Sequence, residues 1–216
     1  TLSGGTLVNG VMRPSGLTLN SGVISADVTG SGATNKMTSG LVTLNGEIRS
    51  SGDVNVLAGT LRLGASERLN DQARLYINGG TFDMGNYSET VGRLRLRNAN
   101  IVTGNAPGTL TAYIYELESG SISGSLSGGQ GGLVKVSDGT ADGGLVEITT
   151  PANYIGVTGV DAGTLRLGVG NALPVTTALT VSGGVLDLGT HSHQVGSFTL
   201  EGGLVERGSL VVPSGT

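Results

Sequence analysis

The stretch AGTLRLG at residues 58–64 occurs a second time at residues 162–168. From these two starting points the sequence aligns without a gap as far as residues 104 and 208, and 17 of the first 44 paired positions are identical. Self-similarity at a fixed long spacing is the signature of a repeat architecture. The chain is therefore expected to stack similar units along one axis, each touching only its neighbours.

A second frame supports this interpretation. The pattern L-x-SG-x-IS begins at Leu19 and returns at Leu117, an offset of 98 residues where the first frame has 104. One loop insertion would account for the difference. We expect one continuous body over residues 1–216, built from about two copies of a unit of roughly 100 residues, 1–110 and 111–216.

The composition favours many short strands joined by tight turns. The 216 residues include 40 glycines, seven aromatic residues and no tryptophan, together with abundant Val, Leu and Ile. Glycine suits frequent turns with positive φ, and branched aliphatic residues suit extended segments in a packed sheet. Cysteine is absent, so neither disulfides nor thiolate metal sites are expected. A net charge of −4 argues against nucleic acid as a partner, and no apolar run approaches the length of a membrane span.

Apolar and polar residues alternate in short runs about ten residues apart. In GTLRLG at residues 59–64 and 163–168, a period of two places the two leucines on one face and the arginine on the other. Strands of three to five residues are expected, and no segment shows the periodicity of a helix. Hairpin-built sandwiches bury large aromatic residues, which are scarce here. An all-β, single-stranded parallel β-helix of about ten coils fits better, at roughly 20 residues per coil.

The segment AGTLRLGVGNALPVTTALTVSGGVLDLGTHSHQVGSFTLEGG, residues 162–203, resembles the autotransporter-associated β-strand repeat. This family occurs in the passenger regions of Gram-negative autotransporters and in giant secreted surface proteins. The first copy departs modestly, with LYINGGTFDMG where the second has LTVSGGVLDLG. The resemblance implies a right-handed parallel β-helix that is exported to the cell surface or secreted, and a part in passenger folding. The β-barrel translocator of such proteins is not in this sequence.

Arg93, Arg95 and Arg97 form a basic stripe on the outward face of a predicted strand. Guanidinium groups pair with carboxylate or sulfate in a fork, so the stripe is the best candidate for binding anionic glycans or a host surface. The second copy has Ser, Thr and Glu at the equivalent positions. The repeat scaffold therefore does not require these arginines.

Two further groups of polar residues favour structural roles. Asp83 and Asp187 occupy the same position in the two copies, which favours capping of a turn through backbone N–H groups over a carboxylate site for polysaccharide cleavage. His191 and His193 lie two residues apart without an evident third ligand, so solvated histidines are expected and a metal site is not.

No other motif points to chemistry. The glycine-rich runs at residues 124–132 and 138–144 resemble calcium-binding nonapeptide repeats, but neither completes that frame, and we expect loops and turns. There is no nucleophile elbow, P-loop or cysteine nucleophile. The chain is expected not to be an enzyme, with no catalytic residues, cofactor or bound metal.

These observations predict a structural, adhesin-like segment of a cell-surface or extracellular stalk. A second possibility is a subunit of an end-to-end filament, and a third is a polysaccharide-cleaving β-helix. Residues 199–203 resemble residues 1–5, and the sequence PSG at residue 213 recurs from residue 14. This predicts either continuation of the coils in a longer chain or head-to-tail association of copies.

Overall fold

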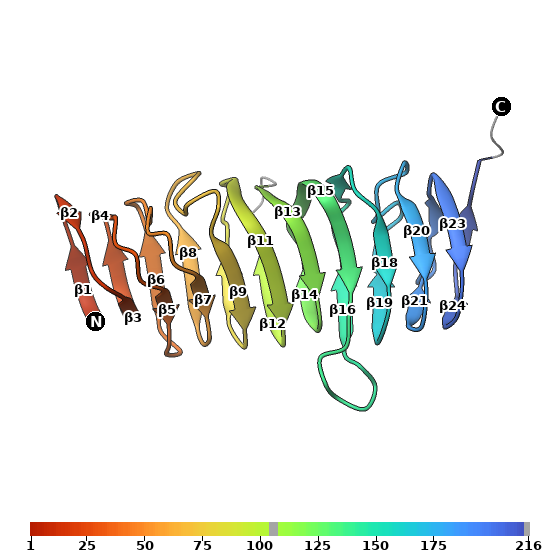
Figure 1. The fold of residues 1–216 in the computed structure, drawn as a ribbon, viewed down its shortest axis with the longest axis horizontal. Coiled ribbons are helices and arrows are strands. Elements are labelled where there is room, and N and C mark those ends of the chain that lie inside the picture. Colours follow the sequence, from red (N-terminus) through yellow and green to blue (C-terminus); the bar gives the residue numbers. More distant parts are fainter. Residues whose placement is uncertain (104–107, 214–216) are drawn as a thin grey trace.

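The chain forms a rod of stacked β-coils, and the computed structural model describes residues 1–103 and 108–213 (Figure 1). The described residues contain no helix, and successive coils lie side by side from the N-terminal to the C-terminal end. Every pairing between strands is parallel, and the strands make a β-solenoid of about 11 turns. The predicted parallel β-helix of about ten coils is confirmed. In the part of the chain described, no helix is long and apolar enough to cross a membrane.

The strands are short and numerous. In chain order they are β1 (Leu2–Leu7), β2 (Val11–Met12), β3 (Leu17–Ile24), β4 (Asp27–Val28), β5 (Thr34–Lys36), β6 (Leu41–Leu44), β7 (Val54–Val56), β8 (Thr60–Leu63), β9 (Arg74–Asn78), β10 (Thr81–Asp83), β11 (Glu89–Arg97), β12 (Ala99–Val102), β13 (Thr109–Leu117), β14 (Gly120–Ile122), β15 (Ser125–Lys135), β16 (Leu145–Ile148), β17 (Asn153–Tyr154), β18 (Thr158–Val160), β19 (Thr164–Leu167), β20 (Ala178–Val181), β21 (Val185–Asp187), β22 (Ser192–Gln194), β23 (Ser197–Leu200), β24 (Leu204–Glu206) and β25 (Ser209–Val211).

Two long stacks of strands run the length of the rod. Face A is the stack that contains, in order, the first part of β3, then β5, β7, β9, the C-terminal parts of β11, β13 and β15, and β18, β20 and β23. Face B is the stack that contains the second part of β3, then β6, β8, β10, β12, β14, β16, β19, β21 and β24. Shorter pairings, such as β2–β4 and β22–β25, close the third side.

Five strands are longer than the predicted three to five residues. These are β1, β3, β11, β13 and β15, with six to eleven residues, because each continues around a corner from one side of the rod to the next. Glycine permits the bend in β3: Gly22 has φ +122°, and a Cβ there would lie 2.4 Å from the Gly5 carbonyl oxygen of the preceding coil. The period of two correctly predicted alternating strands, but it did not predict that a strand can continue around a corner.

Inward and outward positions follow the predicted alternation. All four leucines of the two LRL segments are buried, each at most 1% exposed, whereas Arg62 lies outside. Like residues stack from coil to coil, and one inner ladder on face B runs Val42, Leu61, Phe82, Ile101, Ile122, Ile148 and Leu167. The core is thus a set of aliphatic ladders that extends the whole length of the rod.

The two copies of the repeat have matching strands. β8 and β19 have the same bounds when shifted by 104 residues, and so do β10 and β21. Between β15 and β16 the chain makes a nine-residue loop, residues 136–144, that projects from the side of the rod (Figure 1). The corresponding connection in the first copy, between β5 and β6, has four residues, 37–40. This loop supplies five of the six residues by which the two sequence offsets differ.

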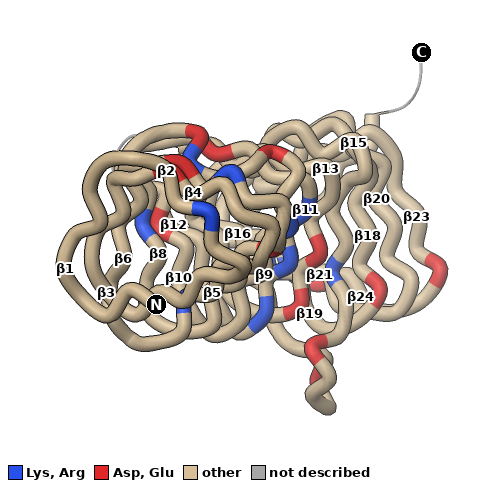
Figure 2. The backbone as a smooth tube through the Cα atoms, turned by 60° about the vertical axis from the view of Figure 1, so that its left-hand side comes forward, with Lys and Arg blue, Asp and Glu red and all other residues tan. Residues whose placement is uncertain are grey.

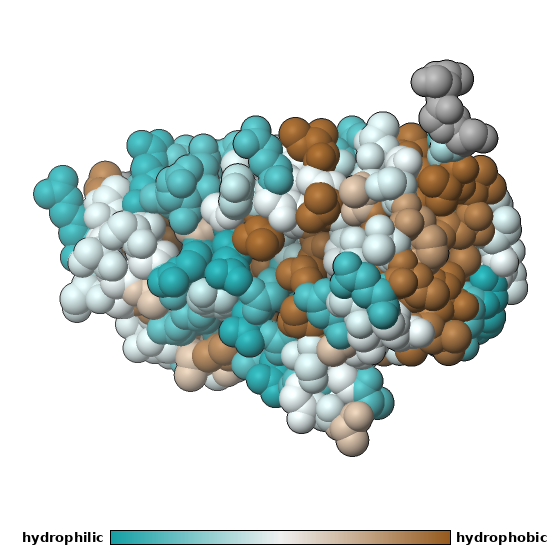
Figure 3. Space-filling view, turned by 45° about the vertical axis from the view of Figure 1, so that its right-hand side comes forward, coloured by the Kyte–Doolittle hydropathy of each residue, from teal (hydrophilic) through white to brown (hydrophobic). Residues whose placement is uncertain are grey.

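The last described coil exposes apolar side chains. Leu200 is 53% exposed, although its neighbour in the inner ladder, Val181, is fully buried. This coil has a neighbouring coil on one side only among the described residues, and an apolar area covers that part of the surface (Figure 3). Residues 214 and 215, part of the match between the two ends of the sequence, lie outside the described residues.

Leu165 lies in a second inner ladder of face B, between Val146 and Leu186, which makes a direct prediction. Leu165→Asp should lower the free energy of unfolding by about 4 kcal/mol or more, because it places an unpaired carboxylate inside the rod. Leu145→Asp, on the preceding coil of face B at a 39% exposed position, should cost less than about 1 kcal/mol. Urea unfolding followed by circular dichroism compares the two. Equal losses would contradict the assigned orientation of these strands.

Candidate functional site

The three arginines of the predicted ligand stripe lie on face A, in the middle of the rod. Alternation along β11 turns Leu94 and Leu96 inward and leaves Arg93, Arg95 and Arg97 outside, each side chain between 43% and 48% exposed. Parallel pairing with β13 brings a second row of charged residues beside them. The register of the two strands places Arg95 beside Glu116 of β13.

The neighbouring row consists of Glu116 and Glu118, and it pairs with the stripe in a zigzag. Arg95 Nε lies 3.3 Å from a Glu116 carboxylate oxygen, and Arg97 Nε lies 3.5 Å from Glu118. Arg93 also pairs with Glu116, and Arg95 donates to Glu118, which raises the pKa of the Arg95 guanidinium. Basic and acidic residues accordingly lie next to one another around β9 and β11 (Figure 2). The stripe is an ion-pair ladder in which two carboxylates partly neutralise three guanidinium groups.

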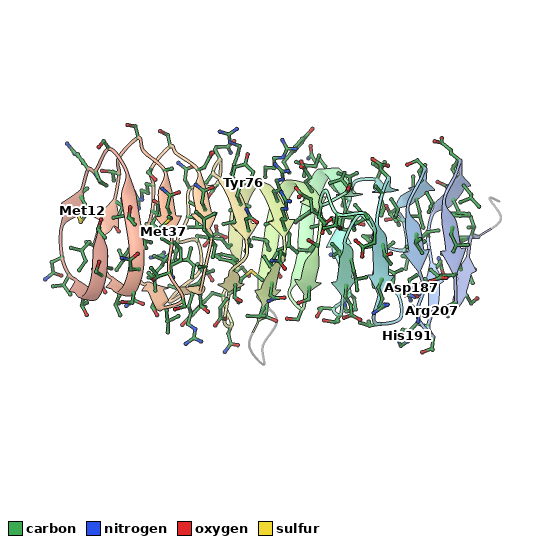
Figure 4. The ribbon with its side chains drawn as sticks, turned by 90° about the horizontal axis from the view of Figure 1, so that it is seen from below. Met12, Met37, Tyr76, Asp187, His191 and Arg207 are labelled. Carbon is green, nitrogen blue, oxygen red and sulfur yellow. The ribbon has the colours of Figure 1, made fainter. Side chains whose placement is uncertain are left out.

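An aromatic residue flanks this ladder on the next coil. Outward positions of face A align Asn35, Asn55, Tyr76 and Arg95 on four successive strands. The guanidinium carbon of Arg74 lies 6.0 Å from the centre of the Tyr76 ring, and Arg74 Nε donates to Asp53 over 2.8 Å. Tyr76 lies on the side of the rod, nearer to its N-terminal than to its C-terminal end (Figure 4).

Two hollows adjoin at this place. The first, of about 260 Å³, is lined by Asn55, Leu57, Tyr76, Asn78, Arg95 and Arg97. The second, of about 770 Å³, also has Asn78 and Arg97 in its wall, and its other side is formed by the projecting loop with Asp138, Thr140 and Asp142. The two hollows adjoin at Asn78 and Arg97, and we call them together the arginine groove.

The projecting loop has a defined shape. The Thr140 backbone N–H donates to Asp138 Oδ1 over 2.9 Å, and the Thr140 hydroxyl donates to Asp142 Oδ1 over 2.6 Å. These hydrogen bonds from Thr140 lower the pKa of both aspartates. Gly139 lies against Arg97, since a Cβ at Gly139 would be 3.8 Å from Arg97 Nη2. The loop therefore reaches the end of the arginine stripe.

The paired aspartates of the repeat cap turns, as predicted. Asp83 Oδ1 accepts a hydrogen bond from the Gly85 N–H, and Asp187 Oδ1 accepts one from the Gly189 N–H, each over 2.9 Å. The second carboxylate oxygen of each residue binds the arginine of the LRL segment on the preceding coil, at 2.7 Å for Arg62 and 2.9 Å for Arg166. The arginine and the aspartate of the repeat thus form one structural unit, which sequence analysis had not connected.

The C-terminal copy buries this unit more deeply. The Asp187 side chain is 1% exposed against 14% for Asp83, and Arg207 also pairs with it (Figure 4). The position equivalent to Arg207 in the first copy is Thr103.

The prediction of two solvated histidines was wrong for His193. Its side chain points inward, with 1% of the residue exposed, and Nε2 donates to the Leu188 carbonyl oxygen over 3.0 Å. Burial lowers the pKa of His193, which keeps the imidazole neutral. His191 is half-buried and contacts His193 edge to face. Among the described residues, no group of three or more His, Cys, Asp or Glu side chains is placed to hold a metal ion.

Two buried lysines were missed in the sequence. Lys36 and Lys135 occupy inner positions of one apolar ladder on face A, where Leu19 and Leu117 precede them on the neighbouring coils. Their amines donate to main-chain carbonyl oxygens at the start of each AGTLRLG segment, Lys36 to Ala58 over 3.0 Å and Lys135 to Ala162 over 3.1 Å. Alternation puts Lys36 on the same side as Thr34 and Lys135 on the same side as Leu133, but TNK has no apolar residue that marks this side as the inner one.

Gly163 of the repeat lies against the base of the projecting loop. It has φ +66°, and a Cβ there would lie 2.2 Å from the Gly143 carbonyl oxygen and 2.4 Å from Lys135 Nζ. Lys135 donates further to the Gly143 carbonyl oxygen over 2.9 Å, which fixes the base of the projecting loop. Burial lowers the pKa of Lys135 to about 8.

Glu89 occupies the repeat position that His193 occupies in the second copy. It is fully buried, and its two carboxyl oxygens accept hydrogen bonds from the Arg68 and Leu69 N–H groups over 2.8 and 3.0 Å. Burial raises the pKa of Glu89 to about 8. The shared position therefore holds an uncharged polar group in both copies near neutral pH.

Comparison of the chain with protein-family models, with curated proteins and with solved structures found no match. Membership of the autotransporter-associated repeat family stays a prediction from the sequence pattern.

Because the two aspartates differ in burial, their alanine variants should differ in stability. Asp187→Ala should lower the free energy of unfolding by about 3 kcal/mol, because it removes the buried partner of two arginines. Asp83→Ala removes the same turn cap and a more exposed ion pair, and should cost about 1 kcal/mol. Chemical denaturation measures both. Equal losses would show that the turn cap common to both aspartates, and not burial, dominates.

Glu89 and Lys135 together predict a minimum of stability near pH 8. Between about pH 4.5 and 8 the folded chain keeps a proton on Glu89 that the unfolded chain has lost, so stability falls as pH rises. Between about pH 8 and 10.5 Lys135 is deprotonated when folded and protonated when unfolded, so stability rises with pH. Denaturant unfolding across this range measures the curve.

Glu89→Gln should flatten the part of that curve below pH 8, where stability falls. Lys135→Met should flatten the part above pH 8, where stability rises. A wild-type curve that is flat from pH 5 to 8, together with an unchanged slope in Glu89→Gln, would mean that Glu89 is ionised when folded. Its charge would then be held by the two backbone N–H groups alone.

Proposed function

We propose that this chain is a structural segment of an extracellular or cell-surface stalk, and that its outer surface binds glycans. The structural part of the proposal rests on one observation: the polar residues common to both copies have structural roles. Asp83 and Asp187 cap turns and pair with the arginines of the LRL segments, so these groups support the coil. A rod that is held by such repeated contacts can separate two objects in space without any catalytic group.

The placement of the carboxylates argues against polysaccharide cleavage. Asp83 on β10 and Asp187 on β21 are separated by four intervening strands of face B, which is about 24 Å at the spacing of paired strands. Glycosidic cleavage by paired carboxylates requires the two groups within roughly 10 Å of one another. Each carboxylate is also already engaged by an arginine and a backbone N–H.

The arginine stripe supports the adhesive part of the proposal. It is half-exposed, it is absent from the second copy, and it makes no contribution to the inner ladders. Location outside a Gram-negative cell follows from the resemblance to the autotransporter-associated repeat, and it is proposed on that basis.

Adhesion should depend on the stripe. The variant that changes Arg93, Arg95, Arg97, Glu116 and Glu118 to glutamine removes the charges without leaving a buried carboxylate unpaired. Beads coated with this variant should lose at least tenfold in retention on a glycan array, relative to the wild-type chain. The control Arg49→Gln with Glu47→Gln neutralises an exposed pair elsewhere and should bind like the wild-type chain.

Unchanged retention of the five-residue variant would remove the stripe from the proposal. Catalysis is tested on pectin and alginate by release of reducing ends, and none is expected. Steady turnover that is lost in Asp83→Ala would favour the polysaccharide-cleaving alternative.

A further inference from the structure

We infer that the arginine groove is a binding site for a linear, uncharged oligosaccharide, with Tyr76 as its stacking surface and the projecting loop as its opposite wall. This inference rests on the proposed adhesive function and names its site and ligand class.

The first argument is that two departures from the repeat meet in one place. The arginines of β11 are not required by the scaffold, since the second copy has none at those positions. The loop of residues 136–144 is also not required, since the first copy makes the same connection with four residues. The two features come from different copies of the repeat, yet Gly139 of the loop lies against Arg97, and Asp138 of the loop lines the same hollow as Arg97. Packing of the coils does not account for this coincidence.

The second argument is the chemistry of the lining. Asn55 and Asn78 offer amide groups that both donate and accept hydrogen bonds, and Tyr76 adds a half-buried ring. The opposite side of the groove adds Asp138 and Asp142, whose carboxylates accept hydrogen bonds. Sugar hydroxyls both donate and accept, and the C–H faces of a sugar ring stack on an aromatic side chain. A hydroxyl-rich ligand therefore matches every kind of group in the lining.

The third argument is charge. The guanidinium groups that line the groove belong to Arg95 and Arg97, and the carboxylates that line it belong to Asp138 and Asp142. Arg95 and Arg97 are already paired with Glu116 and Glu118, so a sulfated chain would find no unpaired cation in the lining and would be repelled by the two aspartates. Uncharged glycans avoid this repulsion.

The test is isothermal titration calorimetry of the full chain with four hexasaccharides: chitohexaose, cellohexaose, hexagalacturonate and a heparin hexasaccharide. At least one of the two uncharged hexamers should bind, with an affinity that changes less than twofold between 50 and about 500 mM salt, because no ion pair forms. The heparin hexasaccharide should bind at least tenfold more weakly. Tighter binding of heparin, or no binding of either uncharged hexamer, would overturn the assignment.

Two variants locate the site. Tyr76→Ala should lower the affinity at least tenfold, whereas Tyr87→Ala, a 38% exposed tyrosine in a different hollow, should leave it unchanged. Replacing residues 136–144 with Met-Thr-Ser-Gly, the sequence of residues 37–40, should also weaken binding at least tenfold. The replacement keeps a carbonyl partner for Lys135, because Lys36 donates to Thr38 in that shorter turn.

The outcomes separate this inference from the adhesive function itself. If the five-residue stripe variant loses retention on the array but Tyr76→Ala and the loop replacement keep full affinity, adhesion stands and the groove does not hold the ligand. If the wild-type chain is retained on no glycan surface, the adhesive function fails first. Circular dichroism tests whether each variant folds. If the loop replacement does not fold, Tyr76→Ala alone decides whether the groove holds the ligand.

Discussion

Parallel stacking of coils in register is the constraint on which the rest of this structure depends. Each strand pairs with its counterpart about one coil earlier and one coil later, so every inward position is covered above and below by the same position of the neighbouring coils. An inward side chain must therefore suit its two neighbours in the ladder. Apolar residues satisfy this along the ladder from Val42 to Leu167, where all are aliphatic except Phe82.

Four buried ionisable residues bind the main chain, whereas the buried hydroxyl of Thr34 on β5 has no hydrogen-bond partner in the described part of the chain. Lys36 and Lys135 turn their amines to carbonyl oxygens at the start of the repeat, and Glu89 and His193 bind main-chain groups at another corner. A buried polar group without a partner is costly, so each of these residues stabilises one backbone geometry over others. Buried polar contacts at the corners thus define where the chain turns, while the aliphatic ladders supply most of the buried surface.

The outer surface is free of this constraint, and it is where the two copies differ. On the outward side of face A, Arg93 and Arg95 of β11 occupy the positions that Ser197 and Thr199 of β23 occupy in the second copy. The loop of residues 136–144 is a second difference that the inner ladders tolerate, because it leaves from a corner. Features that the scaffold does not require are the ones that recognition can use. The arginine groove combines two of them.

The sequence alone determined the class of fold, the repeat and the orientation of the strands. The period of two in GTLRLG and RLRLR, together with the 104-residue frame, was sufficient because stacking requires the same residue types at the same positions. The turn caps at Asp83 and Asp187 were predictable for the same reason.

Only the tertiary structure decided which residues meet across coils. Arg93, Arg95 and Arg97 were visible as a stripe, but Glu116 and Glu118 are 23 residues away from their partners, and only the register of β11 and β13 identifies them. Likewise, the approach of the loop to Arg97 depends on how far it projects from its corner. Periodicity along one strand fixes which way a side chain points, whereas its neighbours on adjacent coils depend on the length of every turn in between.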